Sequence, residues 1–446
     1  MQLLLQDEYR DFLKGYDLSL RRGLRVNSSK ISINQFRKIF PHPLSESPFS
    51  RECFYLDTPH KAGSDPLHHA GAYYMQEPSA ASVIDVLNPT PGEWILDLCA
   101  APGGKSTQIA ARIGNRGLLW SNEYVASRSK ILQQNLERCG VRNAIVSNRD
   151  TGPLCQHLEG MFDAVLVDAP CSEEGMFRKE PQALTEWSED NIRLCANRQL
   201  EILNNASMAV RPGGRLVYST CTFAPEENEC TIARFLEAHD DFELMPISVS
   251  WGRKGFDIDL VRPFSSVELR NCDLTLCQRI FPQHGGEGHF IALLHRLGED
   301  TIPSRPLYSP PAKDPNRKAA EELYKDCFND LPDGVLVTFG DQVRLLPTSM
   351  PECRGYGTAG VALATVCKNR LEPCHSIFVS ATKEQCRRTI DLDQSDPRLI
   401  AFLHGEEIAC DEKGWTAICV NGIPVGFGKA SGGKLKNRYP KGLRLL

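Results

Sequence analysis

The feature that most constrains the fold is a regular alternation of short apolar runs and longer amphipathic runs between residues 94 and 219. This alternation is typical of parallel strands joined by helical crossovers. The runs at 162–167 and 215–219 are mostly apolar, as expected for strands covered on both faces. We therefore predict an α/β fold with a Rossmann-like sheet. Its expected strands are 94–98, 117–122, 144–146, 162–167 and 215–219, and its expected helices are 105–113, 126–139 and 191–210.

A Pro-rich stretch at 303–315 divides the chain of 446 residues. We predict a small N-terminal α+β domain at 1–75, the α/β domain at 76–300, a linker at 301–316 and a β-rich domain at 317–446. The start, MQLLLQDEYRDFL, lacks the basic region and cleavage site of a signal peptide, so an amphipathic helix is expected. Because no apolar run reaches membrane-spanning length, we expect a cytoplasmic protein with no membrane partner.

Seventeen cysteines are spread along the chain without the paired spacing of a zinc site or a disulfide framework. We expect reduced thiols, most of them packed in cores, and no bound metal.

Positive charge is concentrated in two short segments. Residues 21–38 and 425–446 each hold six Lys or Arg residues and no acid, and without these twelve charges the net charge of −5 would be −17. Such segments are typical of surfaces that contact phosphates, although solvated basic faces remain an alternative.

The segment from Asp97 to Thr107, DLCAAPGGKST, follows the first predicted strand. Ligands of doubly wound sheets bind at this edge, and Gly103 and Gly104 let a ligand approach the backbone closely. A phosphate-binding P-loop is excluded, because the position that the motif reserves for glycine holds Cys99.

Acids also follow the second and third strands, at Glu123 and Asp150. A single acid at such a place is usually a helix cap or a loop residue. Three acids at successive strand ends instead favour an adenosine-bearing cofactor, with Glu123 on the ribose and Asp150 near the adenine.

Two cysteines end the fourth and fifth strands, in the motifs Asp168-Ala-Pro-Cys171-Ser and Ser-Thr-Cys221-Thr. Either one alone would be read as a core thiol. Since both fall at the cofactor edge beside an acid, the pair predicts a nucleophile and a helper.

These motifs carry a resemblance to a known family. DLCAAPGGKS, VDAPCSEEGMFR and GGRLVYSTCTFAPEENE resemble the RNA (cytosine-5)-methyltransferases of the Nop/Sun (RsmB/RsmF-type) family. The similarity continues through LRVN (24–27), YMQEPSAAS (74–82) and RIFPQHGGEGHFIALL (279–294), and so spans essentially the whole chain. The ending KASGGKLKNRYPKGLR resembles the PUA-like RNA-binding extension of the bacterial RsmF branch, whose substrate is small-subunit ribosomal RNA.

The resemblance implies a class I methyltransferase that uses S-adenosylmethionine and modifies cytosine in the decoding region of 16S rRNA. Cys221 is expected to attack carbon-6 of cytosine and Cys171 to assist release. Asp168 is expected to bind the pyrimidine edge, and Lys105 to support the same pocket.

Further expected contacts follow from these motifs. Cofactor contacts are expected from Cys99, Ala100, Ala101, Pro102, Gly103, Gly104, Lys105, Glu123, Arg128, Asp150 and Asp168. RNA contacts are expected from Arg25, Asn27, Lys429, Lys434, Lys436 and Lys441. The expected partner is 16S rRNA or the small ribosomal subunit, bound by a monomer.

Other functions are compatible with parts of this pattern. A tRNA cytosine-5 methyltransferase would share every catalytic motif. A non-catalytic RNA-binding factor for ribosome assembly would keep the fold without needing Cys171 and Cys221. A methyltransferase for proteins or small molecules would not need a cysteine pair, because its acceptor is already a good nucleophile.

Overall fold

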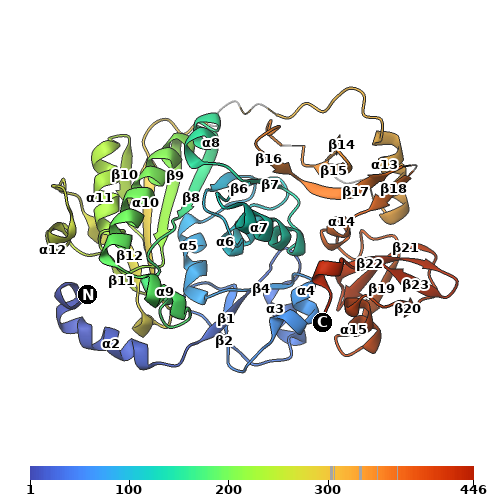
Figure 1. Cartoon of the computed structure of the whole chain (residues 1–446), viewed down its shortest axis with the longest axis horizontal. Helices are drawn as coiled ribbons and strands as arrows, with labels where there is room; N and C mark the ends of the chain where they lie inside the picture. The colour runs from blue at the N-terminus through green and yellow to red at the C-terminus, as the bar shows by residue number, and fades with distance from the viewer. Residues whose placement is uncertain (302–304, 306, 331–333, 349, 369, 446) are drawn as a thin grey trace.

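The computed structural model describes residues 1–301, 305, 307–330, 334–348, 350–368 and 370–445. Figure 1 shows a central α/β part, an N-terminal segment along its lower edge and a C-terminal part beside it on the right. Within the described residues, no helix combines the length and the apolar character that crossing a membrane requires.

The described residues form a central sheet of ten strands in the order β11-β12-β13-β9-β8-β5-β6-β7-β16, with β10 beside β13. Its parallel strands confirm the five predicted ones: β5 (Trp94–Asp97), β6 (Leu118–Asn122), β7 (Ala144–Ser147), β8 (Phe162–Asp168) and β9 (Val210–Thr220). The three predicted helices are confirmed as α6 (Gly104–Ile113), α7 (Ala126–Arg138) and α10 (Glu189–Ala209). Only β9 departs clearly from expectation, since it begins five residues earlier.

The order of the parallel strands locates the ligand site. Strand β5 pairs in parallel with β6 on one side and with β8 on the other. The chain runs outward from β5 to β6 and β7, and then crosses back to β8 and β9. This reversal opens a crevice at the carboxyl end of β5, where doubly wound sheets bind their ligands.

Helices cover both faces of the sheet. Trp94 and Leu96 of β5 pack in one apolar cluster with α8 (Thr151–His157), α10 and α11 (Glu229–Ala238). Ile95, the residue between them, packs in a second cluster with α5 (Ser82–Leu87), α6 and α7. Double coverage explains why these strands are nearly continuous apolar runs. The smaller helices are α9 (Pro181–Glu186) and α12 (Ile258–Val261).

An antiparallel group extends the sheet beyond β9, and no strand was predicted there. Strand β13 (His289–Arg296) lies antiparallel to β9. It pairs in turn with β10 (Phe242–Met245) and β12 (Gln278–Ile280), and β12 pairs with β11 (Arg253–Lys254).

The N-terminal part is an antiparallel sheet preceded by helices. The predicted amphipathic start forms α1 (Gln2–Leu5) and α2 (Tyr9–Asp17). Phe12 of α2 packs edge-on against Phe223 and Phe281, with ring centroids 5.4 and 5.5 Å apart. The sheet order is β2-β3-β1-β4, formed by β1 (Arg22–Val26), β2 (Leu44–Glu46), β3 (Cys53–Leu56) and β4 (Tyr73–Met75), with helices α3 (Ile33–Ile39) and α4 (Pro66–His69).

The C-terminal part is rich in strands, as predicted. One sheet has the order β14-β15-β17-β18 and consists of β14 (Val335–Phe339), β15 (Gln342–Leu346), β17 (Val361–Cys367) and β18 (Arg370–Pro373). The other has the order β19-β21-β22-β23-β20 and consists of β19 (Thr389–Leu392), β20 (Ile408–Ala409), β21 (Gly414–Val420), β22 (Ile423–Ser431) and β23 (Lys434–Asn437). The helices are α13 (Arg317–Cys327), α14 (His375–Val379) and α15 (Pro397–His404).

One strand of the C-terminal part belongs to the central sheet. Strand β16 (Gly357–Ala359) pairs antiparallel with β7, although it lies within the range 317–446 that was predicted as a separate domain. Pro303 and Pro306 of the predicted linker lie outside the described residues. Arg305 is anchored on the sheet by its guanidinium, 2.8 Å from the Asp163 carboxylate. The predicted domain boundaries stay predictions.

Candidate active site

The loop between β5 and α6 forms a cradle at the switch point. Gly103 caps α6 with φ +110°, a backbone conformation that glycine adopts readily. Asp97, at the end of β5, is fully buried, and its Oδ2 accepts a hydrogen bond of 2.6 Å from Ser106 Oγ. Its Oδ1 has no hydrogen-bond partner in the described part of the chain. Burial raises the pKa of Asp97 to about 7.

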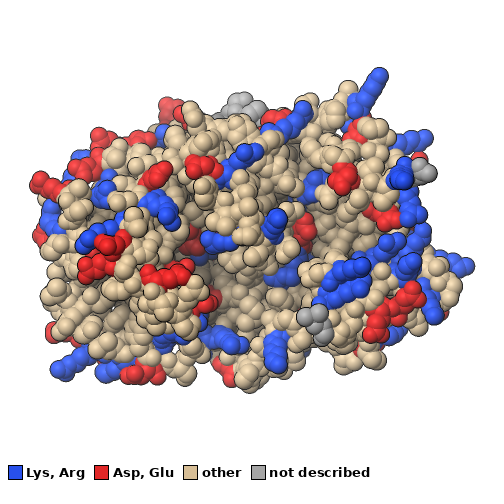
Figure 2. All heavy atoms as spheres, in the orientation of Figure 1, with Lys and Arg blue, Asp and Glu red and all other residues tan. Residues whose placement is uncertain are grey.

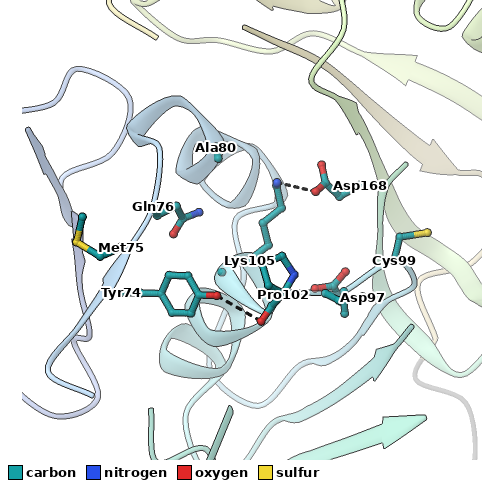
Figure 3. Close-up of a pocket in the computed structure, with 12 residues that line it drawn as sticks. Tyr74, Met75, Gln76, Ala80, Asp97, Cys99, Pro102, Lys105 and Asp168 are labelled. Atoms are coloured by element: carbon teal, nitrogen blue, oxygen red, sulfur yellow. Dashed lines mark hydrogen bonds and ion pairs between the residues drawn. The ribbon is translucent and has the colours of Figure 1, made fainter. Parts of the chain in front are cut away.

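A cavity of about 210 Å³ opens beside this cradle (Figure 3). Its wall includes Tyr74, Met75 and Gln76, which come from the N-terminal part, and the Tyr74 hydroxyl donates to Pro102 O at 3.3 Å. No site role was predicted for these three residues, although they are the first three of the family-like motif YMQEPSAAS. The other lining residues are Ala80, Asp97, Cys99, Ala100, Ala101, Pro102, Gly104, Lys105 and Asp168.

An ion pair crosses the cavity wall. Lys105 Nζ lies 2.7 Å from Asp168 Oδ2 (Figure 3). Ser219 Oγ donates to Asp168 Oδ1 at 2.6 Å. Burial alone would raise the pKa of Asp168, but the Lys105 ammonium and these hydrogen bonds hold it below its ordinary value. The carboxylate is therefore ionised and lines the cavity.

The two remaining predicted acids have different surroundings. Glu123 is buried after β6, and its Oε1 accepts from Val125 N at 2.9 Å. Arg128 Nη1 lies 3.8 Å from Glu123 Oε2, while Arg128 Nη2 donates to Ala101 O at 3.0 Å. Glu123 and Arg128 thus adjoin the cradle. Asp150 is an exposed cap of α8, accepting from Gly152 N at 3.0 Å, and it lines a different cavity.

The two predicted catalytic cysteines lie together. Cys171 follows β8 and Cys221 follows β9, and their sulfurs are 3.4 Å apart. The contact with Cys221, reinforced by burial, raises the pKa of Cys171 well above its ordinary value. Cys171 therefore keeps its proton in this arrangement. Cys99 is a third thiol at this edge, and burial raises its pKa well above the usual range.

A buried histidine near this site was missed. His289 of β13 lies with Nδ1 2.9 Å from Ser79 Oγ, and burial lowers its pKa to about 4, so the ring is neutral. Both residues lie in family-like motifs, at 279–294 and 74–82, which was the only signal available in the sequence.

Two predicted RNA-binding residues are corrected by the structure. Arg25 is 1% exposed and donates to Gln76 Oε1, Gly104 O and Thr107 Oγ1 at 2.9, 3.1 and 2.7 Å. Asn27 is 2% exposed and donates to Gly71 O and Cys139 O. Both side chains are buried and engaged in internal hydrogen bonds, so they do not form an RNA surface. Arg25 instead supports the cavity wall through Gln76 and Gly104.

The predicted C-terminal lysines are all exposed. Lys429 and Lys436 pair across β22 and β23, Lys434 lies at the turn between these strands, and Lys441 follows them. Figure 2 shows Lys and Arg atoms gathered at the right-hand end of the molecule, over the region of β21–β23. Such a surface fits a polyanion.

The strand order, the antiparallel β13 beside β9 and the cradle at the switch point define a class I S-adenosylmethionine-dependent methyltransferase. Family models described as 16S rRNA methyltransferase RsmB/F, N-terminal domain of 16S rRNA methyltransferase RsmF and methyltransferase RsmF PUA domain match residues 84–295, 1–78 and 389–445. The chain belongs to the RsmB/F family.

Similar proteins agree with this assignment. Ribosomal RNA small subunit methyltransferase F of Vibrio cholerae is 31% identical over 97% of this chain and 93% of its own length. The Klebsiella pneumoniae protein of that name is 32% identical over 98% of this chain and 92% of its own length. A methyltransferase homologue from Pyrococcus horikoshii superposes with a TM-score of 0.57 at 30% identity, covering 66% of this chain and 93% of that one. NSun6 from Pyrococcus horikoshii with SFG shows the same fold, with a TM-score of 0.54 at 22% identity. The match covers 67% of this chain and 97% of that one.

Proposed function

We propose that this methyltransferase modifies carbon-5 of cytosine in the decoding region of 16S rRNA, through a covalent bond between Cys221 and the base. The observation that carries the proposal is the pair of sulfurs 3.4 Å apart, at the ends of the strands that also present Asp168. A methyltransferase whose acceptor is already nucleophilic has no need of such a pair.

The residues around the cradle fit S-adenosylmethionine, which supplies an electrophilic methyl group when bound. Glu123 offers carboxylate oxygens to the ribose hydroxyls, as acids after the second strand do in nucleotide sites. Asp97 Oδ1 is a buried acceptor without a partner among the described residues. The backbone from Cys99 to Gly104 supplies close contacts, and Arg128 holds this loop through Ala101 O. Asp150, the acid that follows β7, is proposed to lie near the adenine ring of the cofactor.

The two cysteines have different roles in the reaction at the base. Cys221 attacks carbon-6 as a thiolate, and the electron pair of the 5,6 double bond makes carbon-5 nucleophilic. Asp168, held by Lys105, accepts a hydrogen bond from the pyrimidine edge. Once the Cys221 sulfur is bonded to carbon-6, its contact no longer raises the pKa of Cys171. After methylation, Cys171 gives its own proton to solvent and, as a thiolate, takes the proton of carbon-5. The double bond re-forms, the carbon–sulfur bond breaks, and its electron pair returns to Cys221.

Ribosomal RNA is proposed as the substrate because the relatives are named for it and the PUA region carries exposed lysines. A base must leave its stack to reach Cys221, so an unpaired or opened region is favoured. Bisulfite sequencing of 16S rRNA and tRNA from a deletion strain distinguishes the two RNA classes. Loss of 5-methylcytosine from tRNA alone would favour the tRNA alternative.

The cysteine assignment predicts opposite behaviour for two variants. Cys221→Ala abolishes methylation and leaves no covalent complex, because nothing adds to carbon-6. Cys171→Ala still permits attack and methyl transfer but impairs release, so enzyme and RNA stay bonded. A denaturing gel with RNA then shows a slower band that RNase collapses and that the double variant lacks.

Two other outcomes would change the assignment. Cysteines that only fill the core would give milder loss of stability and no adduct from either variant. An adduct with Cys221→Ala but not with Cys171→Ala would place the nucleophile after β8, as in DNA cytosine methyltransferases. A catalytically silent wild-type chain on every RNA would favour a role in ribosome assembly.

A further inference from the structure

Two consecutive buried residues that precede α11 contact the loops that carry the cysteines. Glu227 and Asn228 are both fully buried. They lie in the segment PEENE (225–229), which ends the family-like motif GGRLVYSTCTFAPEENE and for which no role was predicted. Burying a carboxyl and an amide costs free energy of folding unless their polar atoms are hydrogen-bonded. The partners of these two side chains therefore indicate their role.

Glu227 holds the loop of Cys171 on both sides of the cysteine. Its Oε2 accepts from Ser172 N at 3.1 Å, and its Oε1 accepts from Ser172 Oγ. Gln199 Nε2 donates to Glu227 Oε2 at 2.7 Å and to Pro170 O at 2.9 Å. Pro170, the residue before Cys171, is therefore linked to the same carboxyl through Gln199. The residues before and after Cys171 are thus tied to one side chain.

Asn228 holds the loop of Cys221 in the same way. Its Oδ1 accepts from Thr220 Oγ1 at 2.6 Å, and its Nδ2 donates to Thr222 O at 3.0 Å. The residues before and after Cys221 are therefore tied to this amide. The two loops are also joined directly, because Ser172 Oγ lies 2.8 Å from Thr222 Oγ1.

We propose that Glu227 and Asn228 are positioning residues that set the placement of the two sulfurs, Glu227 for release by Cys171 and Asn228 for attack by Cys221. The inference rests on the covalent mechanism proposed above. Neither residue touches the base. Each acts by fixing a cysteine whose sulfur must be placed within a fraction of an ångström for its own step.

The separate contacts predict a split between neighbouring variants. Asn228→Ala frees the Cys221 loop, so covalent-complex formation should slow by about tenfold to a hundredfold, including in the Cys171→Ala background. Glu227→Ala frees the Cys171 loop, so attack continues while release slows by a similar factor, and the adduct accumulates as in Cys171→Ala. Rapid-quench denaturing gels measure both steps.

Conservative variants separate positioning from simple stability. In Glu227→Gln the amide oxygen can still accept from Ser172 N and Gln199 Nε2, so release should recover toward the native rate. Asn228→Asp keeps the acceptor for Thr220 but cannot donate to Thr222 O, so attack should stay slow. Glu227→Asp and Asn228→Asp serve if the alanine variants do not fold, and they should show the same split to a smaller degree.

Glu226→Ala is the matched control, because this neighbouring carboxylate makes no side-chain hydrogen bond to either loop among the described residues. Calorimetric binding of S-adenosylmethionine verifies that each variant is folded. Equal loss of attack and release in both variants, in proportion to a fall in Tm, would overturn the proposal, as would failure of Glu227→Gln to restore release. If the single variant Cys171→Ala forms no adduct with RNA, the covalent mechanism is wrong, and the roles proposed for Glu227 and Asn228 are wrong with it.

Discussion

Two carboxyl groups at the ends of the neighbouring strands β5 and β8 differ in their pKa because Lys105 forms an ion pair with Asp168 and not with Asp97. Burial raises the pKa of Asp97 to about 7. Asp168 is also buried, but Lys105 at 2.7 Å keeps its pKa low. The site therefore combines a readily protonated carboxyl at the proposed cofactor cradle with a fixed negative charge where the base is proposed to bind.

Glu123 provides the test of cofactor recognition at this scale. Glu123→Ala removes the proposed ribose acceptor and should weaken S-adenosylmethionine binding by about 1.5–3 kcal/mol, the range for hydrogen bonds to charged groups. Calorimetry on the full chain measures the change, with the exposed Glu159→Ala as control. Unchanged affinity in a folded Glu123→Ala protein would show that the ribose does not bind at Glu123.

Among the elements, β16 ties the C-terminal part to the cofactor edge of the sheet. Without it β7 would be an exposed edge strand. Because β16 runs antiparallel and Gly357 pairs with Ser147, the last residue of β7, the preceding residues lie at the carboxyl edge. There Tyr356 stacks on His157 of α8, with ring centroids 3.7 Å apart and planes 4° from parallel.

Loss of this stack should loosen the edge locally. Tyr356→Ala removes an aromatic contact of a kind worth about 0.5–1.5 kcal/mol beyond its buried area. Amide hydrogen exchange in β7 and β16 should accelerate, while exchange in β5 and β8 stays native. Tyr124→Ala, which removes a ring that is 69% exposed, serves as the control. Native exchange at β7 in Tyr356→Ala would show that the strand pairing alone holds the edge.

For the molecule as a whole, RNA binding is an electrostatic problem, because the chain carries a net charge of −5. An acidic protein needs a local basic surface to hold a polyanion. The exposed lysines of the β22–β23 hairpin provide one. The basic segment near the N-terminus does so less than expected, since Arg25 is buried against α6.

Salt dependence tests this surface. Replacing Lys429, Lys434 and Lys436 together by Ala should weaken RNA binding and lower the slope of log K against log salt by about 0.7–0.9 for each lost phosphate contact. Filter binding across a salt series measures the slope. Lys318→Ala, an exposed lysine on α13, controls for a general change in net charge. An unaltered slope would exclude the hairpin as a phosphate-contacting surface.

The local pattern of the sequence was sufficient to predict which strand ends meet at one edge of the central sheet. Apolar runs mark strands covered on both faces, and the carboxyl ends of parallel strands meet at one edge. Motifs after β5, β8 and β9 therefore had to converge, and the structure brings Lys105, Asp168, Cys171 and Cys221 together without any contact having been known in advance.

Only the tertiary structure decided the features that depend on what packs against a residue. The sequence of a basic segment is the same whether its arginine faces solvent or is buried. Arg25 is buried against the first turn of α6. Strand β16 is too short to reveal its partner β7, which lies some 210 residues earlier. The contacts of Glu227 and Asn228 with the cysteine loops required β8 and β9 to be side by side. The physical reason is that periodicity reports which face of an element is apolar, whereas burial of a polar side chain depends on long-range packing that no local pattern encodes.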